Sequence, residues 1–182
     1  MLLTMWADPA MYLATTFTAR MLSERGICVD LLYRTPNRHM DVAGDVKFGS
    51  RSRLRPVGGG HTGWRDKIDY AKFIVKAIML ARREKPDAVI GYNTLGIVAA
   101  FIVTRVRPGT KLIYHNFDFD VSTKALGLLG RLLRRVELVA ARRADLTIFP
   151  APGRATEYKA MARLTRDPQS VMNCYPLLWP RQ

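Results

Sequence analysis

Short apolar runs alternate with longer segments of helical periodicity along almost the whole chain. The apolar runs predict strands at 2–6, 27–33, 53–57, 87–91, 111–115, 145–150 and 170–173. The segments between them place apolar residues three and four positions apart and predict helices from Asp8 to about Arg25, at 64–84 and 94–106, and at about 122–143 and 154–163. Such alternation with short connections is typical of a parallel sheet. The sequence therefore predicts an α/β fold: a Rossmann-like open parallel sheet with helices on both faces, in a single domain.

The predicted topology indicates where a ligand should bind. In an open parallel sheet, the binding crevice lies beyond the carboxyl ends of the strands. Asp8 and Pro9 follow the first predicted strand and predict a helix start, with a capping carboxylate and a proline in the first turn. The segments expected at the crevice are 7–10, 91–94, 115–120 and 150–154.

The stretch KLIYHNFDFD, residues 111–120, ends a predicted buried strand on groups that bind or exchange protons. We expect His115 at the carboxyl end of that strand, open to solvent and facing the crevice, where imidazole can donate or accept a hydrogen bond. A purely structural histidine is the alternative. Asp118 and Asp120 follow in the same loop and are candidates for holding a sugar or a basic group. For Asp120, capping of the next helix is the favoured interpretation.

The stretch GYNTLG, residues 91–96, is a second candidate for ligand contact. It places Asn93 or Thr94 at a helix start, where free backbone N–H groups can bind an anion, and an ordinary N-cap is the alternative. The glycine-rich GGGHTG at 58–63 lacks the GK[ST] ending of a phosphate-binding loop. No histidine has partner ligands at metal-binding spacing, so no metal site is predicted.

Charge adds a preference for anionic partners. The 182 residues include 29 Lys and Arg against 15 Asp and Glu, a formal net charge of +14, and the excess is spread over both halves of the chain. A folded surface with this balance attracts phosphorylated ligands, acidic lipid headgroups or nucleic acid. The two cysteines lie far apart, which fits a reducing compartment, and no apolar run approaches the ~20 residues that span a bilayer. We expect a cytoplasmic protein.

The predicted helix 122–143 separates its cations from its apolar residues. At 100° per residue, one face carries Lys124, Arg131, Arg135 and Arg142. The opposite face, expected to pack on the sheet, carries Leu126, Leu129, Leu133, Val136 and Ala140. A basic helix flanked by leucines suits contact with anionic lipid on the inner face of the membrane, and simple solvation explains it equally well.

Four stretches, taken in order, resemble the N-terminal domain of family 4 glycosyltransferases with the GT-B architecture. They are the strand and helix at 84–106, the strand end at 111–120, the segment at 134–158 and SVMNCYP at 170–176. The third is the most telling, because a basic helix ending in RRAD, then a strand, then a small-residue turn into a helix is usual in that family. The resemblance covers nearly the whole chain and implies one half of a GT-B architecture.

The resemblance also implies roles for individual residues. In that family the C-terminal domain holds most of the nucleotide-sugar donor, and the N-terminal domain largely recognises the acceptor. A histidine at the position of His115 is implied to point into the cleft and to bind or orient the sugar, which makes it the catalytic candidate. Many members have a glycine pair near the donor phosphate at the position of loop 7–10; Asp8 would repel a phosphate there, so an acceptor contact is expected. The predicted acceptor-binding residues are Asp8, Asn93, Thr94, Asn116, Asp118 and Asp120.

We therefore expect residues 1–174 to form the N-terminal domain of a glycosyltransferase and residues 175–182 to begin a linker to a missing C-terminal donor-binding domain. The predicted function is acceptor binding in a retaining glycosyltransferase that uses a nucleotide-sugar as substrate and needs no cofactor. The chain alone should be inactive. Expected partners are the nucleotide-sugar donor, a glycan or lipid-linked acceptor, an anionic membrane surface and a separate donor-domain chain.

Two other function classes remain open at this point. The same domain could serve as a non-catalytic scaffold at a membrane surface, or as the recruiting half of a two-chain enzyme. A basic nucleic-acid-binding protein is the second alternative, suggested by the net charge of +14. The basic residues are dispersed and lack an aromatic stacking motif, so no nucleic acid is expected.

Overall fold

A computed structural model of the chain describes residues 1–9, 12–35, 48–58, 61–117 and 127–171. Within these residues, one sheet contains seven strands in the order β3-β2-β1-β4-β5-β6-β7, and every neighbouring pair is parallel. The strands are β1 (Leu2–Met5), β2 (Val29–Arg34), β3 (Ser52–Val57), β4 (Ala88–Tyr92), β5 (Lys111–His115), β6 (Leu146–Phe149) and β7 (Gln169–Ser170). The predicted parallel sheet is confirmed.

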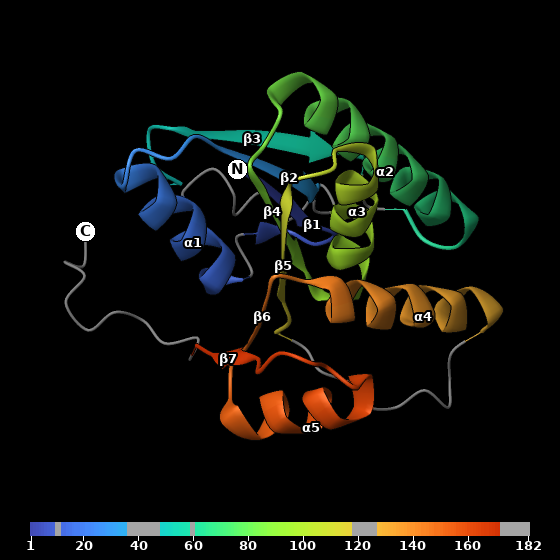
Figure 1. Cartoon of the computed structure of the whole chain (residues 1–182). Helices are drawn as coiled ribbons and strands as arrows, with labels where there is room; N and C mark the ends of the chain where they lie inside the picture. Colours follow the sequence, from blue (N-terminus) through green and yellow to red (C-terminus); the bar gives the residue numbers. More distant parts are fainter. Residues whose placement is uncertain (10–11, 36–47, 59–60, 118–126, 172–182) are drawn as a thin grey trace.

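Helices cover both faces of this sheet, as the sequence predicted. They are α1 (Leu13–Glu24), α2 (Trp64–Glu84), α3 (Asn93–Val106), α4 (Leu128–Arg143) and α5 (Pro152–Ala162). Helix α1 lies on one side, and α2, α3 and α4 lie on the other (Figure 1). Buried side chains form one cluster with α1 and a second, larger cluster with α2 to α5. The fold is therefore Rossmann-like.

The order of the strands sets where a ligand crevice can form. From β1 the chain moves outward to β2 and β3, then returns to the other side of β1 for β4, β5, β6 and β7. The direction of winding thus reverses between β1 and β4, and open α/β sheets bind ligands outside the carboxyl ends of the strands at such a reversal. At this edge Met5 pairs with Tyr92, and Tyr92 pairs with His115.

Two glycines allow α3 to start close against this edge. The single hydrogen of the Thr4 hydroxyl is shared between two acceptors, the carbonyl oxygens of Gly96, at 2.9 Å, and Ile90, at 3.2 Å. A Cβ atom at Gly96 would lie 2.4 Å from the Thr4 carbonyl oxygen, and one at Gly91 would lie 2.4 Å from the Ile97 Cα. Only glycine permits this approach, which brings the first residues of α3 to the carboxyl ends of β1 and β4.

The first helix begins later than the sequence predicted. Helix α1 starts at Leu13, so Asp8 does not cap it, and that prediction is wrong. The Pro9 carbonyl oxygen instead accepts the Tyr12 backbone N–H at 3.1 Å and the Thr16 hydroxyl at 3.1 Å. These bonds tie Pro9 to the first turn of α1.

The orientation of α4 agrees with expectation in part: Ala140 is buried, and the cationic face with Arg131, Arg135 and Arg142 is exposed. Its buried residues are Glu137, Ala140 and Ala141. Leu129, expected to pack on the sheet, is 46% exposed. Small side chains and one hydrogen-bonded acid face α3 and α5, and they allow α4 to pack closely. The predicted helix start at 122–126 lies outside the described residues.

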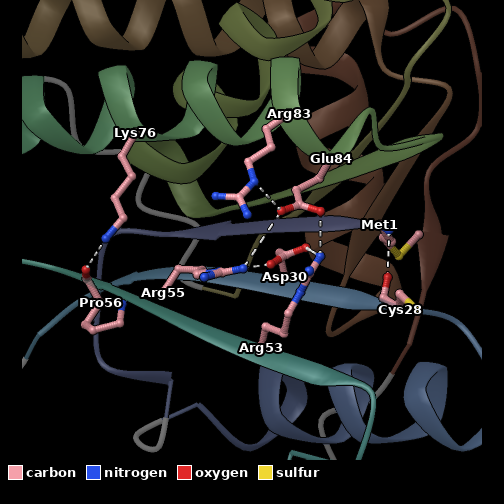
Figure 2. A network of polar contacts seen from close by, with 9 residues as sticks. All are labelled: Met1, Cys28, Asp30, Arg53, Arg55, Pro56, Lys76, Arg83 and Glu84. Atoms are coloured by element: carbon pink, nitrogen blue, oxygen red, sulfur yellow. Dashed lines mark hydrogen bonds and ion pairs between the residues drawn. The ribbon is translucent and has the colours of Figure 1, made fainter.

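The amino-terminal edge of the sheet carries a separate ion-pair network (Figure 2). Buried Asp30 on β2 binds two arginines of β3: Arg53 Nη2 at 2.5 Å and Arg55 Nε at 3.0 Å. Arg53 Nη2 also contacts Glu84, the last residue of α2, at 2.9 Å. The network borders a cavity of about 530 Å³ near Cys28. It ties β2, β3 and α2 together at the edge opposite the expected crevice.

Candidate functional site at the carboxyl ends of β4 and β5

The residues that follow β4 and β5 are joined by hydrogen bonds at the carboxyl edge of the sheet. Asn93 opens α3 with a positive φ of 53°, and its side-chain Oδ1 accepts the Phe117 backbone N–H at 2.8 Å. The Asn116 N–H donates to the Ile148 carbonyl oxygen of β6 at 3.0 Å. Arg154, near the start of α5, donates to the Phe117 carbonyl oxygen at 3.1 Å. Hydrogen bonds therefore connect the carboxyl ends of β4, β5 and β6 with the start of α5.

His115 stands at the carboxyl end of β5, but its ring is buried. The residue is only 5% exposed, so the expectation of an imidazole open to solvent is wrong. The rings of Phe117 and Tyr92 cover it, with centroids 4.4 and 5.5 Å away. Burial lowers the pKa of His115 from 6.5 to about 4, so the imidazole is neutral at physiological pH. Among the described residues, its Nε2 atom has no hydrogen-bond partner.

Asn116 is also buried and only partly satisfied. Its side-chain Nδ2 donates to the Tyr114 hydroxyl at 2.5 Å, while its Oδ1 has no partner within the part of the chain that the structure describes. Leaving a buried polar atom unpaired costs about 1–3 kcal/mol, so most folded proteins satisfy such atoms. Within the described ranges, two consecutive residues at the carboxyl edge thus each carry one buried polar atom without a partner, which makes this edge a candidate site for ligand contact.

A buried glutamate orders the layer beneath this edge. Glu137 of α4 is 0% exposed. Its Oε1 accepts hydrogen bonds from Tyr114 at 2.6 Å, Arg134 at 2.6 Å and Tyr158 at 3.1 Å, and its Oε2 accepts one from Thr94 at 2.9 Å. Burial, followed by the nearby Glu137 charge, raises the pKa of both Tyr114 and Tyr158, which keeps the phenols protonated as donors. The carboxylate thus joins β5, α3, α4 and α5.

The Glu137 cluster was missed by sequence reasoning. The one available signal was a single acid within a helix that is otherwise basic and apolar, three residues after Arg134. Through Glu137, two predicted site residues become connected: Thr94 binds the carboxylate directly, and Asn116 reaches it through the Tyr114 hydroxyl.

The other predicted site residues fall into three groups. Asp8 follows β1 on the same sheet edge and is buried. Asp118, Asp120 and Lys124 lie outside the described residues. Arg131, Arg135 and Arg142 are exposed on α4 and belong to a different surface from the strand ends. No cluster of three or more potential metal ligands occurs in the described ranges, and no helix there is long and apolar enough to cross a membrane.

This topology, with polar groups at the carboxyl ends of a seven-stranded parallel sheet, defines a Rossmann-like α/β domain. The sequence profile of the family described as "Glycosyl transferase 4-like domain" matches residues 14–172. The chain belongs to that family, which confirms the resemblance found in the sequence. No curated protein matches the sequence.

Solved structures share the fold at low sequence identity. A UDP-N-acetylglucosamine 2-epimerase superposes with a TM-score of 0.64 and 11% identity over 94% of this chain and 47% of its own. MurG of Acinetobacter baumannii gives a TM-score of 0.55 and 15% identity, over 94% of this chain and 44% of its own. A sucrose-phosphate synthase chain of Thermosynechococcus elongatus gives a TM-score of 0.60 and 13% identity, over 97% of this chain and 91% of its own. The chain thus spans less than half the length of the first two proteins, and these identities show the fold alone.

Proposed function

We propose that this domain binds the acceptor in a retaining glycosyltransferase that takes its sugar from a nucleotide-sugar donor. The observation that carries the proposal is a pair of buried atoms at the carboxyl edge of the sheet, His115 Nε2 and Asn116 Oδ1, which have no hydrogen-bond partner among the described residues. Sugars present hydroxyl groups that both donate and accept hydrogen bonds. Sugar hydroxyls could therefore pair with both atoms, and the membership of the chain in the glycosyl transferase 4-like family supports a sugar as the ligand.

In this proposal His115 orients a sugar and does not carry a proton as a cation. With a pKa of about 4 the ring is neutral, so Nε2 offers one hydrogen bond whose direction depends on the tautomer. Asn116 Oδ1 accepts a second hydrogen bond from a hydroxyl. Because the ring of Phe117 covers His115, a ligand reaches Nε2 only when that cover is displaced locally. Asp8, Asn93 and Thr94 occupy the same edge and complete the proposed acceptor side.

The donor would be held by a C-terminal domain or a separate chain that meets this edge, with residues 1–174 as the N-terminal domain and 175–182 as the start of the linker. That second half would neutralise the leaving phosphate, and electrostatic stabilisation of the departing group would supply most of the rate. The 182-residue chain by itself is then expected to bind an acceptor and to transfer no sugar. A lipid-linked acceptor would place the reaction at the cytoplasmic membrane surface.

Titration of the chain with saccharides, monitored by NMR of labelled histidine side chains, tests the proposal. Resonances of His115 are identified by their loss in His115→Gln, and His61→Gln provides the matched control. We expect acceptor-type saccharides to shift the His115 signals and nucleotide-sugars to have little effect in the absence of a donor-binding half. If no saccharide perturbs His115 while a nucleotide alone does, the assignment of this edge to the acceptor is wrong.

A further inference from the structure

Helix α4 exposes an apolar stripe on its outer side. Leu128, Leu132 and Val139 are all exposed, with Leu128 at 83%. At 100° per residue these side chains lie within about 40° of one another on the helix. Exposed Arg131, Arg135 and Arg142 border them on one side and Arg143 on the other.

Helix α2 repeats this arrangement. Trp64, Ile68, Val75 and Met79 are exposed, with Trp64 at 66% and Met79 at 63%, and their spacing places them on one helix face. The exposed cations of α2 are Arg65, Lys67, Lys72, Arg82 and Arg83. The Arg65 guanidinium lies 5.6 Å from the centre of the Trp64 ring. Neither stripe is needed for the core, because α2 packs inward through other residues, as does α4. The inward residues are Phe73, Ala77 and Leu80 of α2 and Glu137, Ala140 and Ala141 of α4.

The two stripes belong to one layer of the protein. Helix α3 packs between α2 and α4 on the same side of the sheet (Figure 1). All residues of these three helices are described, and none of their acids is exposed: Asp69 and Glu137 are buried, and Asp66 and Glu84 are half-buried in ion pairs with Arg34 and Arg53. We call this surface, the exposed residues of α2 and α4 with Arg105 of α3, the cationic helical layer.

The opposite side of the sheet has a different charge pattern. Helix α1 pairs Arg20 with Glu24 at 2.8 Å, and that glutamate is exposed. The combination of exposed apolar side chains, many cations and no exposed acid is therefore a property of the cationic helical layer and not of the whole surface.

From these observations we infer that the cationic helical layer docks on an anionic lipid bilayer, with the apolar stripes of α2 and α4 entering the interface and the cations contacting headgroups. Charge complementarity selects this occupant, because a second copy of the same layer would repel it. Nucleic acid is bound through its phosphates and, when it is single-stranded, through aromatic platforms for its bases, so neither mode uses the aliphatic side chains that make up the stripes apart from Trp64. This inference stands independently of the proposed acceptor binding.

Co-sedimentation with vesicles of phosphatidylcholine, with and without phosphatidylglycerol, tests the inference. Each cation near an anionic surface is expected to strengthen binding about fivefold. The double variant Arg131→Gln/Arg135→Gln should therefore bind anionic vesicles about 25-fold more weakly. The matched control, Arg20→Gln/Arg25→Gln, removes the same charge from α1 and from the residue directly after it, on the other face, and should bind almost like the unmodified chain.

The apolar contribution needs its own variant. Leu128→Ser/Leu132→Ser keeps every charge and should also weaken vesicle binding. Brominated lipids should quench the fluorescence of Trp64, and the variant Trp64→Phe should lack this quenched signal. Circular dichroism melts check that each variant is folded. Equal binding to neutral and anionic vesicles, or equal losses in the α1 and α4 charge variants, would overturn the inference. A dimer abolished by the leucine variant, without any vesicle binding, would assign the stripes to a second copy of the chain.

Discussion

The Thr94 hydroxyl donates a 2.9 Å hydrogen bond to the carboxylate of Glu137, although the two residues are 43 positions apart in the sequence. Thr94 belongs to the first turn of α3 beside β4, and Glu137 belongs to the middle of α4. The bond therefore joins the crevice edge to the helix layer behind it. The same carboxylate holds Tyr114, which in turn holds the Asn116 amide. The orientation of the Asn116 side chain thus depends on a buried acid that does not itself lie at the strand ends.

Replacement of Glu137 by Gln tests this dependence. The variant loses the negative charge that faces Arg134, and it presents an NH₂ group to the hydroxyl groups that donate to Glu137. We therefore expect its free energy of unfolding to be about 3 kcal/mol lower. Chemical denaturation measures the difference. The same substitution at exposed Glu157 on α5 is the control and should change the free energy of unfolding by less than about 0.5 kcal/mol. Similar stabilities for the two variants would show that the Glu137 cluster contributes little.

Substitution of Gly96 by Ala should separate α3 from β1. The added methyl group would lie 2.4 Å from the Thr4 carbonyl oxygen, and the backbone has to move to relieve the clash. We expect a loss of about 1–3 kcal/mol in the free energy of unfolding, together with shifted NMR signals at Asn93 and Thr94. Gly153→Ala in α5 meets no atom within 4 Å and should be neutral or slightly stabilising. A stable Gly96→Ala variant with unshifted signals would contradict the close approach.

Protonation of His115 should oppose folding at acidic pH. Its pKa is about 4 in the folded chain and about 6.5 when exposed, so between these values the unfolded state binds more protons. The free energy of unfolding should therefore be highest above about pH 6.5, where the ring is neutral in both states. It should fall by about 3 kcal/mol as the pH drops from 6.5 toward 4. The measurement compares the pH dependence of the free energy of unfolding in the unmodified chain and His115→Gln. The variant should lose less stability over this range.

Direct titration of the imidazole gives an independent check of the same property. The carbon-bound ring protons of His115 should titrate near pH 4 by NMR if the chain stays folded. A midpoint near 6.5 would mean that water reaches the ring freely, and it would restore the solvent-open histidine that the sequence suggested.

The ion-pair network at the amino-terminal edge should support stability without affecting ligand binding. Asp30→Asn removes the charge that faces Arg53 and Arg55, and we expect the free energy of unfolding to fall by about 1–3 kcal/mol. Asp87→Asn, at an exposed position, serves as the control. Saccharide-induced shifts at His115 should be the same in both variants, because Asp30 lies at the other edge of the sheet. A loss of those shifts in the Asp30 variant would connect the two edges.

Much of the architecture was predictable because it depends on local patterns. The predicted helix at 64–84 coincides with α2, Trp64–Glu84, since a long apolar periodicity ended by Pro86 is a local signal. The strand ending at His115 and the helix beginning after Tyr92 were also placed correctly, and strand–helix alternation implied a parallel sheet. The placement of Thr94 and Asn116 at the crevice edge followed from the same alternation.

The sequence by itself thus determined the order and type of the elements, the family and the edge at which polar groups gather, because strand and helix periodicity and the connections between them are local properties. Tertiary structure alone decided that His115 is buried, that Glu137 belongs to the interior and that leucines of α4 face outward. Burial depends on which other elements pack against a side chain, and the partners of Glu137 come from α3, β5, α4 and α5. No pattern along a single helix contains that information.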